Sequence, residues 1–178
     1  MKAISSRELH ALLEIPFSEK RRPMDVAYEV WGLIERGPGR RLRPDTALSA
    51  PEVAFRDMLN FHNAGMGNGF DELLWHANGR SSFVRAFVAA ERVGLRDVSE
   101  ILVAVRAIYE RHGIALPGKL DPEWWLEDKG ALPDDLTAVR EETKALTIRY
   151  WNLPVWPDPD CVYLRLLRYL AGSADIAT

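Results

Sequence analysis

Histidines are the first side chains to test for chemistry, because an imidazole can act as a general base or bind a metal near neutral pH. The chain has four of them, His10, His62, His76 and His112. None is followed by a second histidine four residues later, the spacing that places two ligands on one face of a helix. We therefore predict no local metal site. We expect His62 to be a partly buried core residue and His112 to lie at the C-terminal end of a helix.

A glycine-rich stretch, AGMGNG at residues 64–69, is similar in composition to a phosphate-binding loop. Such loops follow a strand and open a helix, and Lys-Ser or Lys-Thr ends the motif. Here helical periodicity precedes the glycines and no Lys-Ser/Thr follows, so we predict a turn that joins two helices with glycines at positive φ. One alternative stays open, a small enzyme or ligand-binding protein whose cleft is built near residues 64–76 from Asn68, Asp71, His62 and His76.

The other potentially reactive side chains do not indicate a catalytic role. Cys161 is the only cysteine, so it forms no internal disulfide, and the neighbouring Asp158 and Asp160 oppose a thiolate. We expect an inert, half-buried thiol. The adjacent Glu141 and Glu142 would support acid–base chemistry only if they were buried together, and a polar helix face predicts that they are solvated. We assign no catalytic residue, no cofactor and no metal ligand, and expect a non-catalytic protein.

Acidic side chains concentrate in residues 121–142, which carry eight carboxylates and two basic groups. Trp124 and Trp125 lie within this segment. Aromatic side chains beside charges are typical of binding patches, whereas carboxylates near helix starts and tryptophans packed under loops are the ordinary alternative. The predicted protein-interaction surface consists of Glu123, Trp124, Glu127, Asp128, Asp134 and Asp135.

Basic side chains gather in one predicted loop, which contains Arg36, Arg40, Arg41 and Arg43. Arginines so close together can contact phosphates, but no basic recognition helix lies beside them and the net charge of the chain is −3. We therefore expect another protein as the partner and no direct binding of nucleic acid.

The chain has no run of about 18 apolar residues that would predict a membrane span. Its first residues, MKAISSRELHALLE, place Arg7 and Glu8 where a signal peptide needs apolar side chains. We therefore expect a cytoplasmic protein with no membrane contact.

Helical periodicity dominates the sequence and predicts its fold class. Residues 97–112 are the clearest case, with Gly113 placed to end the helix. Ser49 is the predicted N-cap of another helix, and further helices are expected over residues 24–35, 70–76, 122–128 and 133–150. No segment alternates apolar and polar residues as a strand would. The prediction is all-α, a single-domain orthogonal bundle of eight or nine helices over residues 1–178.

One stretch also points to a family. Residues 67–111 read GNGFDELLWHANGRSSFVRAFVAAERVGLRDVSEILVAVRAIYER, and TIRYWNL and VYLRLLRYLAG follow later. This order resembles the C-terminal domain of bacterial DNA-mimic proteins over about residues 50–172, which leaves residues 1–48 as a helical extension. The most specific motif is Asn68, Gly69, Phe70 and Asp71, to which we assign a structural role.

The resemblance implies an all-helical bacterial domain that is not known as an enzyme. The named member presents acidic side chains like a DNA backbone and binds DNA-binding proteins, while most relatives have no assigned role. Duplex DNA carries one charge per about 1.7 Å of its axis, and a chain with a net charge of −3 and 23 basic residues supplies little of that density. We expect a non-catalytic protein-interaction module, with regulation of a DNA-binding protein as one form of that role.

Overall fold

The computed structural model describes residues 6–35 and 42–174, and within those ranges it contains seven α-helices and one short 3-10 helix. The β pairing of the described residues is confined to an isolated bridge between Ser18 and Arg21. The predicted all-α bundle of eight or nine helices is therefore confirmed. The helices are α1 (Ser6–Glu14), α2 (Pro23–Glu35), η2 (Asp45–Ala47), α3 (Ala50–Leu73), α4 (Gly79–Val93), α5 (Arg96–Arg111), α6 (Thr137–Trp151) and α7 (Val162–Ala174).

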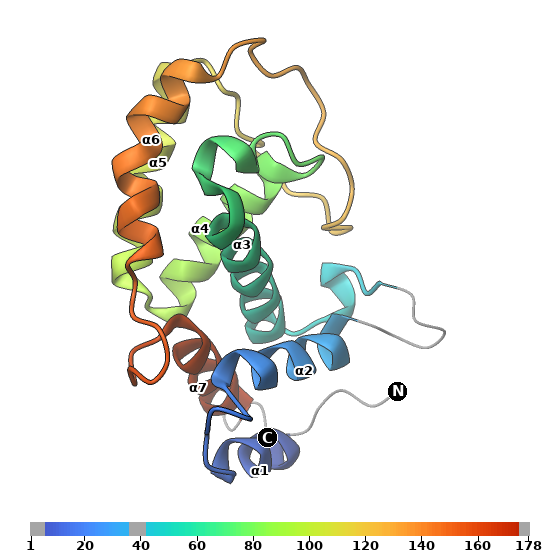
Figure 1. The fold of residues 1–178 in the computed structure, drawn as a ribbon. Coiled ribbons are helices and arrows are strands. Elements are labelled where there is room, and N and C mark those ends of the chain that lie inside the picture. The colour runs from blue at the N-terminus through green and yellow to red at the C-terminus, as the bar shows by residue number, and fades with distance from the viewer. Residues whose placement is uncertain (1–5, 36–41, 175–178) are drawn as a thin grey trace.

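Helix α3 runs through the middle of the molecule, and α2, α4, α6 and α7 all pack against it (Figure 1). Helices α5 and α6 lie side by side along one flank. At the lower end of Figure 1, α1 and α2 cover α7. None of the helices in the described part of the chain has both the length and the apolar character needed to cross a bilayer.

Aromatic rings from four helices form the centre of the core. The ring centroids of Phe61 and Phe70 in α3 lie 6.2 Å apart, and those of Phe83 in α4 and Tyr109 in α5 lie 5.0 Å apart. Tyr150 of α6 meets Phe61 edge to face. All five side chains are at most 1% exposed, and burying one such side chain stabilises the fold by about 1.5–3 kcal/mol.

Helix ends follow the local signals in the sequence. Ser49 caps α3 in a capping box, because its hydroxyl accepts the N–H of Glu52 and the Glu52 carboxylate accepts the N–H of Ser49. Gly94 ends α4 with φ 76°, and Gly113 follows α5 with φ 69°. Both glycines use the left-handed region that ends helices, and the sequence predicted this place for Gly113.

The glycine-rich stretch joins two helical segments at a kink within α3, in agreement with the predicted joint between two helices. Gly69 has φ 86° and ψ 175°, and a helical backbone resumes on its far side. A Cβ at Gly69 would lie 3.1 Å from Thr147 Cγ2. Behind the kink, the carbonyl of Phe70 accepts the Tyr109 hydroxyl at 2.5 Å. The helix expected over residues 70–76 is therefore the last turn of α3, which ends at Leu73.

The helix expected over residues 122–128 does not form. The Asp121 carboxylate does accept the N–H of Glu123 at 2.9 Å, but the chain then continues in turns and bends. Backbone groups that a helix would use internally bond elsewhere, since the Asp128 N–H donates to the Ala77 carbonyl at 2.7 Å. Tertiary contacts thus override the local helix signal.

Helix α6 begins at Thr137 rather than at residue 133. At this start, the Asp135 carboxylate accepts the Thr137 N–H at 2.8 Å. Residues 114–136, here called the strap, consequently contain no helix. In Figure 1 the strap is the gold loop that leaves the top of α5, descends along one side of the molecule and returns to α6.

Candidate functional site: the cavity under the strap

Four charged side chains form an ionic cluster beneath the strap: Asp45, Arg56, Asp57 and Arg85. Arg56 Nη2 lies 2.7 Å from Asp45 and 2.5 Å from Asp57, and it is fully buried. Arg85 Nη1 lies 2.7 Å and 3.5 Å from the same two carboxylates. Burial raises the pKa of Asp57, an effect that the two guanidinium groups oppose. The cluster pairs two cations with two carboxylates, so its formal charge is balanced.

Buried arginines also hold the strap by its backbone. Arg85 Nη2 donates to the carbonyl of Asp121, and Arg80 Nη2 donates to the carbonyls of Lys129 and Gly130 at 2.9 Å and 3.0 Å. The indole of Trp124 lies against Arg56, with the guanidinium carbon 5.1 Å from the ring centroid. A long loop without helices is thereby fixed to α3 and α4 by two arginines that are each 5% exposed and by the contact of half-buried Trp124 with Arg56.

Asp128 fixes the strap to the first turn of α4. Its carboxylate accepts the N–H of Arg80 at 2.7 Å, the N–H of Ser81 at 3.1 Å and the Ser81 hydroxyl. Asn78, the N-cap residue, makes no side-chain cap, so Asp128 takes that role from a distant part of the chain. Its side chain is 8% exposed, which separates it from the other carboxylates of the predicted interaction surface.

A cavity of about 710 Å³ lies between α4 and the strap. Arg80, Arg85 and Ser81 line it from α4, and Lys119 from the strap. The cavity also has apolar lining from the strap, and its acidic lining comes from the same segment. The apolar lining consists of Ala115, Pro117, Leu120, Pro122, Trp124 and Leu126, and the acidic lining of Asp121, Glu123, Glu127 and Asp128. A smaller cavity of about 450 Å³ shares Arg80 and Asp128 and is lined by Trp75 and His76.

Three polar atoms around this cluster are buried and have no hydrogen-bond partner: Arg56 Nη1, Arg85 Nε and Trp124 Nε1. All three are donors. In the described part of the chain, the other unpartnered buried side-chain atoms are Trp31 Nε1 and Asn60 Nδ2, which are also donors. A buried donor without an acceptor costs about 1–3 kcal/mol, so the site is short of acceptors.

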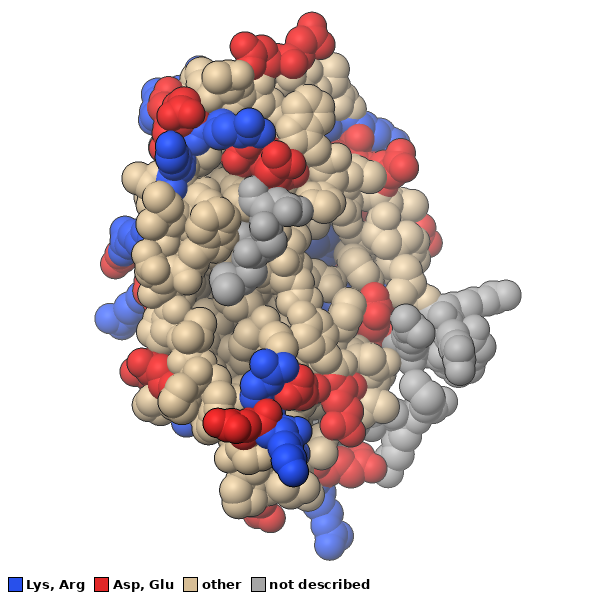
Figure 2. Space-filling model, viewed as in Figure 1, with Lys and Arg blue, Asp and Glu red and all other residues tan. Residues whose placement is uncertain are grey.

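The remaining carboxylates of the predicted surface are exposed. Glu123 and Glu127 lie within the strap, and Asp134 and Asp135 lie just before the start of α6. Figure 2 shows acidic side chains at the top of the molecule, over this junction. The hydrogen bonds from Thr137 hold the pKa of Asp135 below its usual value. Trp124 is half-buried, so the structure places it in the cavity wall.

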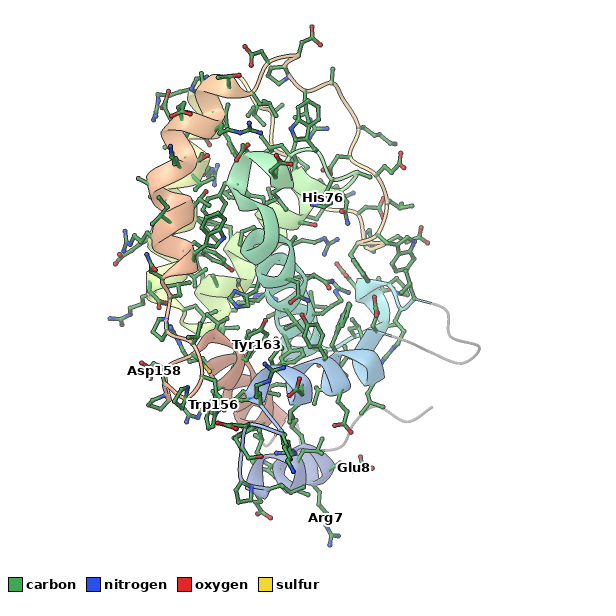
Figure 3. All side chains as sticks on the ribbon, viewed as in Figure 1. Arg7, Glu8, His76, Trp156, Asp158 and Tyr163 are labelled. Atoms are coloured by element: carbon green, nitrogen blue, oxygen red, sulfur yellow. The ribbon has the colours of Figure 1, made fainter. Side chains whose placement is uncertain are left out.

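The alternative site near the glycine kink is not assembled as its residues suggested. His62 is buried and shares a hydrogen bond with the Tyr150 hydroxyl at 2.8 Å, and burial lowers the pKa of His62 to about 4. Its ring centroid lies 4.9 Å from that of Tyr163, which Figure 3 places near the middle of the molecule, well below His76. The side chain of Asn68 is outside the described residues.

Asp71 makes an ion pair of 2.6 Å with Arg140, and both line a surface recess of about 290 Å³. No group of three or more His, Cys, Asp or Glu side chains that could hold a metal occurs among the described residues. Cys161 is buried, and burial raises the pKa of its thiol, which agrees with an inert role. His112 is the C-cap residue of α5, as predicted, and its Nε2 lies 2.8 Å from a carboxylate oxygen of Glu142.

Sequence reasoning missed the residues that build the site. Arg56 and Arg85 stand inside largely apolar stretches, AFRDML and FVRAF, and an arginine in that setting was the available signal. The sequence also did not identify which tryptophans are exposed. In the structure these are Trp75 and Trp151, which are 57% and 43% exposed. Of the basic loop, Arg43 bonds back to the carbonyl of Ile34 at 3.2 Å, and Arg36, Arg40 and Arg41 lie outside the described residues.

Comparison of the chain with protein-family models, with curated proteins and with solved structures gives no match. The resemblance to the C-terminal domain of bacterial DNA-mimic proteins therefore stays a prediction from the sequence motifs.

Proposed function

We propose that this protein is a non-catalytic binding module that recognises a basic partner protein through the strap. The observation that carries the proposal is the strap itself. Loops longer than about 12–15 residues without secondary structure are uncommon in compact domains and usually have a function. This one is held by Arg80, Arg85 and Asp128, so its shape is set before a partner arrives. Such preorganisation lowers the entropic cost of binding.

The charge of the strap indicates the chemistry of the partner. Its exposed carboxylates are Asp121, Glu123, Glu127, Asp134 and Asp135, against the two lysines Lys119 and Lys129. A local excess of exposed negative charge attracts a basic surface over long range and orients the encounter. The alternative, an acidic segment that is only solvated, would not need buried arginines to hold its backbone in place.

DNA-binding proteins are one class of basic partner, and the sequence resemblance to DNA-mimic proteins favours that class. Such proteins carry clusters of Lys and Arg that neutralise phosphates. Acidic and basic side chains are interspersed on the face shown in Figure 2, so the proposed contact is confined to the strap rather than spread over the molecule. The proposal also places the protein in the cytoplasm, as an interaction module.

Affinity capture with charge-reversed variants tests the proposal. The test variant carries Glu123→Lys, Glu127→Lys and Asp134→Lys, and leaves the helix-capping Asp128 intact. The matched control carries Glu19→Lys, Glu29→Lys and Glu91→Lys, which change the net charge equally at exposed positions elsewhere. We expect a defined protein to bind the native chain and the control, and to be lost by the test variant while thermal stability is kept.

Binding of the recovered protein is then measured with purified components at two salt concentrations. Weaker binding at higher salt supports an electrostatic contact. Equal loss in both triple variants would show a nonspecific charge effect, and unchanged binding by the test variant would remove the strap from the interface.

A further inference from the structure

We propose that the smaller cavity, of about 450 Å³, receives one lysine or arginine side chain of the partner. The cationic head group would contact the indole of Trp75 and pair with the carboxylates of Glu127 and Asp134. This inference rests on the proposed function and specifies which group of a basic partner is recognised, and where on the strap.

The charge of the lining distinguishes the two cavities. The larger cavity is formally neutral, because its lining contains four basic and four acidic side chains: Arg80, Arg85, Lys119 and Lys129 against Asp121, Glu123, Glu127 and Asp128. The lining of the smaller cavity contains one basic and three acidic side chains: Arg80 against Glu127, Asp128 and Asp134. With its histidine counted as neutral, the smaller cavity has a formal charge of −2 and therefore favours a cation.

The one arginine of the smaller cavity does not neutralise the exposed carboxylates. Arg80 is 5% exposed, its Nε lies 3.9 Å from Asp128, and its Nη2 donates to two strap carbonyls. Asp128 in turn accepts the N–H groups at the start of α4. Glu127 and Asp134 are exposed, and within the described part of the chain neither side chain has a hydrogen bond or an ion pair. A ligand therefore reaches both without displacing a buried group.

The exposed indole of Trp75 supplies the second element of a cation site. It is 57% exposed and lines the same cavity as the two carboxylates. The face of an aromatic ring attracts a cation, and tryptophan does so most strongly. Half-buried Leu132 and Pro133 also line the cavity and offer apolar surface to the methylene stem of a lysine or arginine. Both parts of a long cationic side chain thus find a complement there.

The recess beside Trp151 provides a comparison within the same molecule. Trp151 is 43% exposed and lines that recess together with Asp71 and Glu72. These two carboxylates already pair with Arg140, at 2.6 Å and 3.1 Å. An exposed tryptophan beside paired carboxylates offers a cation much less than one beside carboxylates without partners, so we expect no cation to bind in this recess.

The probes are blocked single amino acids. The charged probes are Nα-acetyl-lysine N-methylamide and its arginine counterpart. The control is the same lysine derivative acetylated on its side-chain nitrogen, which keeps the stem and removes the charge. Binding is followed by the indole N–H resonances in nitrogen-15 NMR spectra, in which Trp75→Leu and Trp151→Leu identify the two resonances by removing them. We expect the charged probes to shift the Trp75 resonance saturably and to leave that of Trp151 in place, and the neutral probe to shift neither.

Two variants locate the charged probe. Glu127→Gln with Asp134→Asn removes two exposed ion-pair partners at constant size, so affinity should fall about fivefold. The matched control, Glu29→Gln with Glu91→Gln, changes the net charge equally at exposed positions elsewhere and should bind as the native chain does. Trp75→Leu keeps an apolar side chain but removes the ring, so affinity should fall about threefold, as followed by the Gly130 and Leu132 amide resonances.

The outcomes separate this inference from the proposed function. The cavity proposal is overturned if no charged probe shifts the Trp75 resonance, if the neutral probe shifts it equally, or if the Glu127→Gln, Asp134→Asn chain binds as tightly as the native chain. It is also overturned if the captured partner binds Trp75→Leu, which changes no charge, with native affinity.

Loss of the partner on reversal of Glu123, Glu127 and Asp134 would in those cases still support the proposed function, through the surface charge of the strap alone. Conversely, charged probes that bind at Trp75 would support the cation site even if charge reversal left partner binding unchanged. That second result would overturn the proposed function only.

Discussion

Two parts of α3 both bury polar groups, but they do so in opposite ways. Near the strap, Arg56 and Asp57 belong to a cluster of full charges, and donors there remain open. Farther along the helix, His62 is a neutral group that shares its proton with Tyr150 and is surrounded by rings. No polar atom of His62, Tyr150 or Tyr163 is among the unpartnered buried atoms of the described residues.

The difference separates the proposed binding region from a region that only holds the fold. A closed network gains nothing from a ligand, because every donor already has an acceptor. The cluster of full charges instead leaves donors without acceptors, and each such donor costs free energy in the folded chain. The histidines, which are the usual candidates for chemistry, fall in the closed region or on the surface, whereas the arginines mark the open one.

Removal of a cation from the open cluster has the largest expected effect on this comparison. Arg56→Met leaves Asp45 and Asp57 with one guanidinium between them, so the free energy of unfolding should fall by about 3–5 kcal/mol. Urea denaturation measures this loss. Arg106→Met, which breaks an exposed ion pair with Glu110, is the control and should cost less than about 1 kcal/mol. Equal effects would mean that the cluster is not buried.

The closed region should respond to pH. The pKa of His62 is about 4 in the folded chain, against about 6.5 when unfolded, so the unfolded chain binds more protons between these values. Stability should fall as the pH drops from about 6.5 to 4, by about 3 kcal/mol from this residue. Comparison of the native chain with His62→Gln by denaturation at each pH isolates the effect. An identical slope in both chains would contradict it.

The kink that shapes the closed region should not tolerate a side chain. Gly69→Ala forces a Cβ into positive φ and to 3.1 Å from Thr147 Cγ2, so it should destabilise the fold by about 1–3 kcal/mol. Gly32 lies within α2 with no atom near its Cβ position, and Gly32→Ala should instead stabilise by about 0.5–1 kcal/mol. Thermal melting of the two variants gives opposite signs if the kink is real.

The attachment of the strap to α4 should have the smallest effect of the four. Asp128→Ala removes the acceptor for the N–H groups of Arg80 and Ser81, so it should cost about 0.5–2 kcal/mol, as the loss of other helix caps does. Glu127→Ala, next to it and exposed, should stay within about 0.5 kcal/mol. Hydrogen exchange should also quicken at the start of α4 in the first variant, and unchanged exchange would argue against this cap.

Local signals in the sequence determined most of the helices, because caps and periodicity act over a few residues. Ser49 and Gly113 were identifiable as helix ends, and residues 97–112 as a helix. Helix 122–128 failed for the opposite reason. Its Asp-Pro start is a valid local signal, but the Ala77 carbonyl and the buried arginines take the backbone groups instead.

The candidate site was determined by the sequence only in its exposed part. The acidic composition of residues 121–142 identified the carboxylates that the strap displays, since charge excess is visible without a fold. The tertiary structure alone decided that Asp128 faces inward to α4, that Trp124 covers Arg56, and that Arg85 keeps an open donor. These contacts join residues far apart in the chain, and spacing along a sequence carries no information about such pairs once the chain folds back on itself.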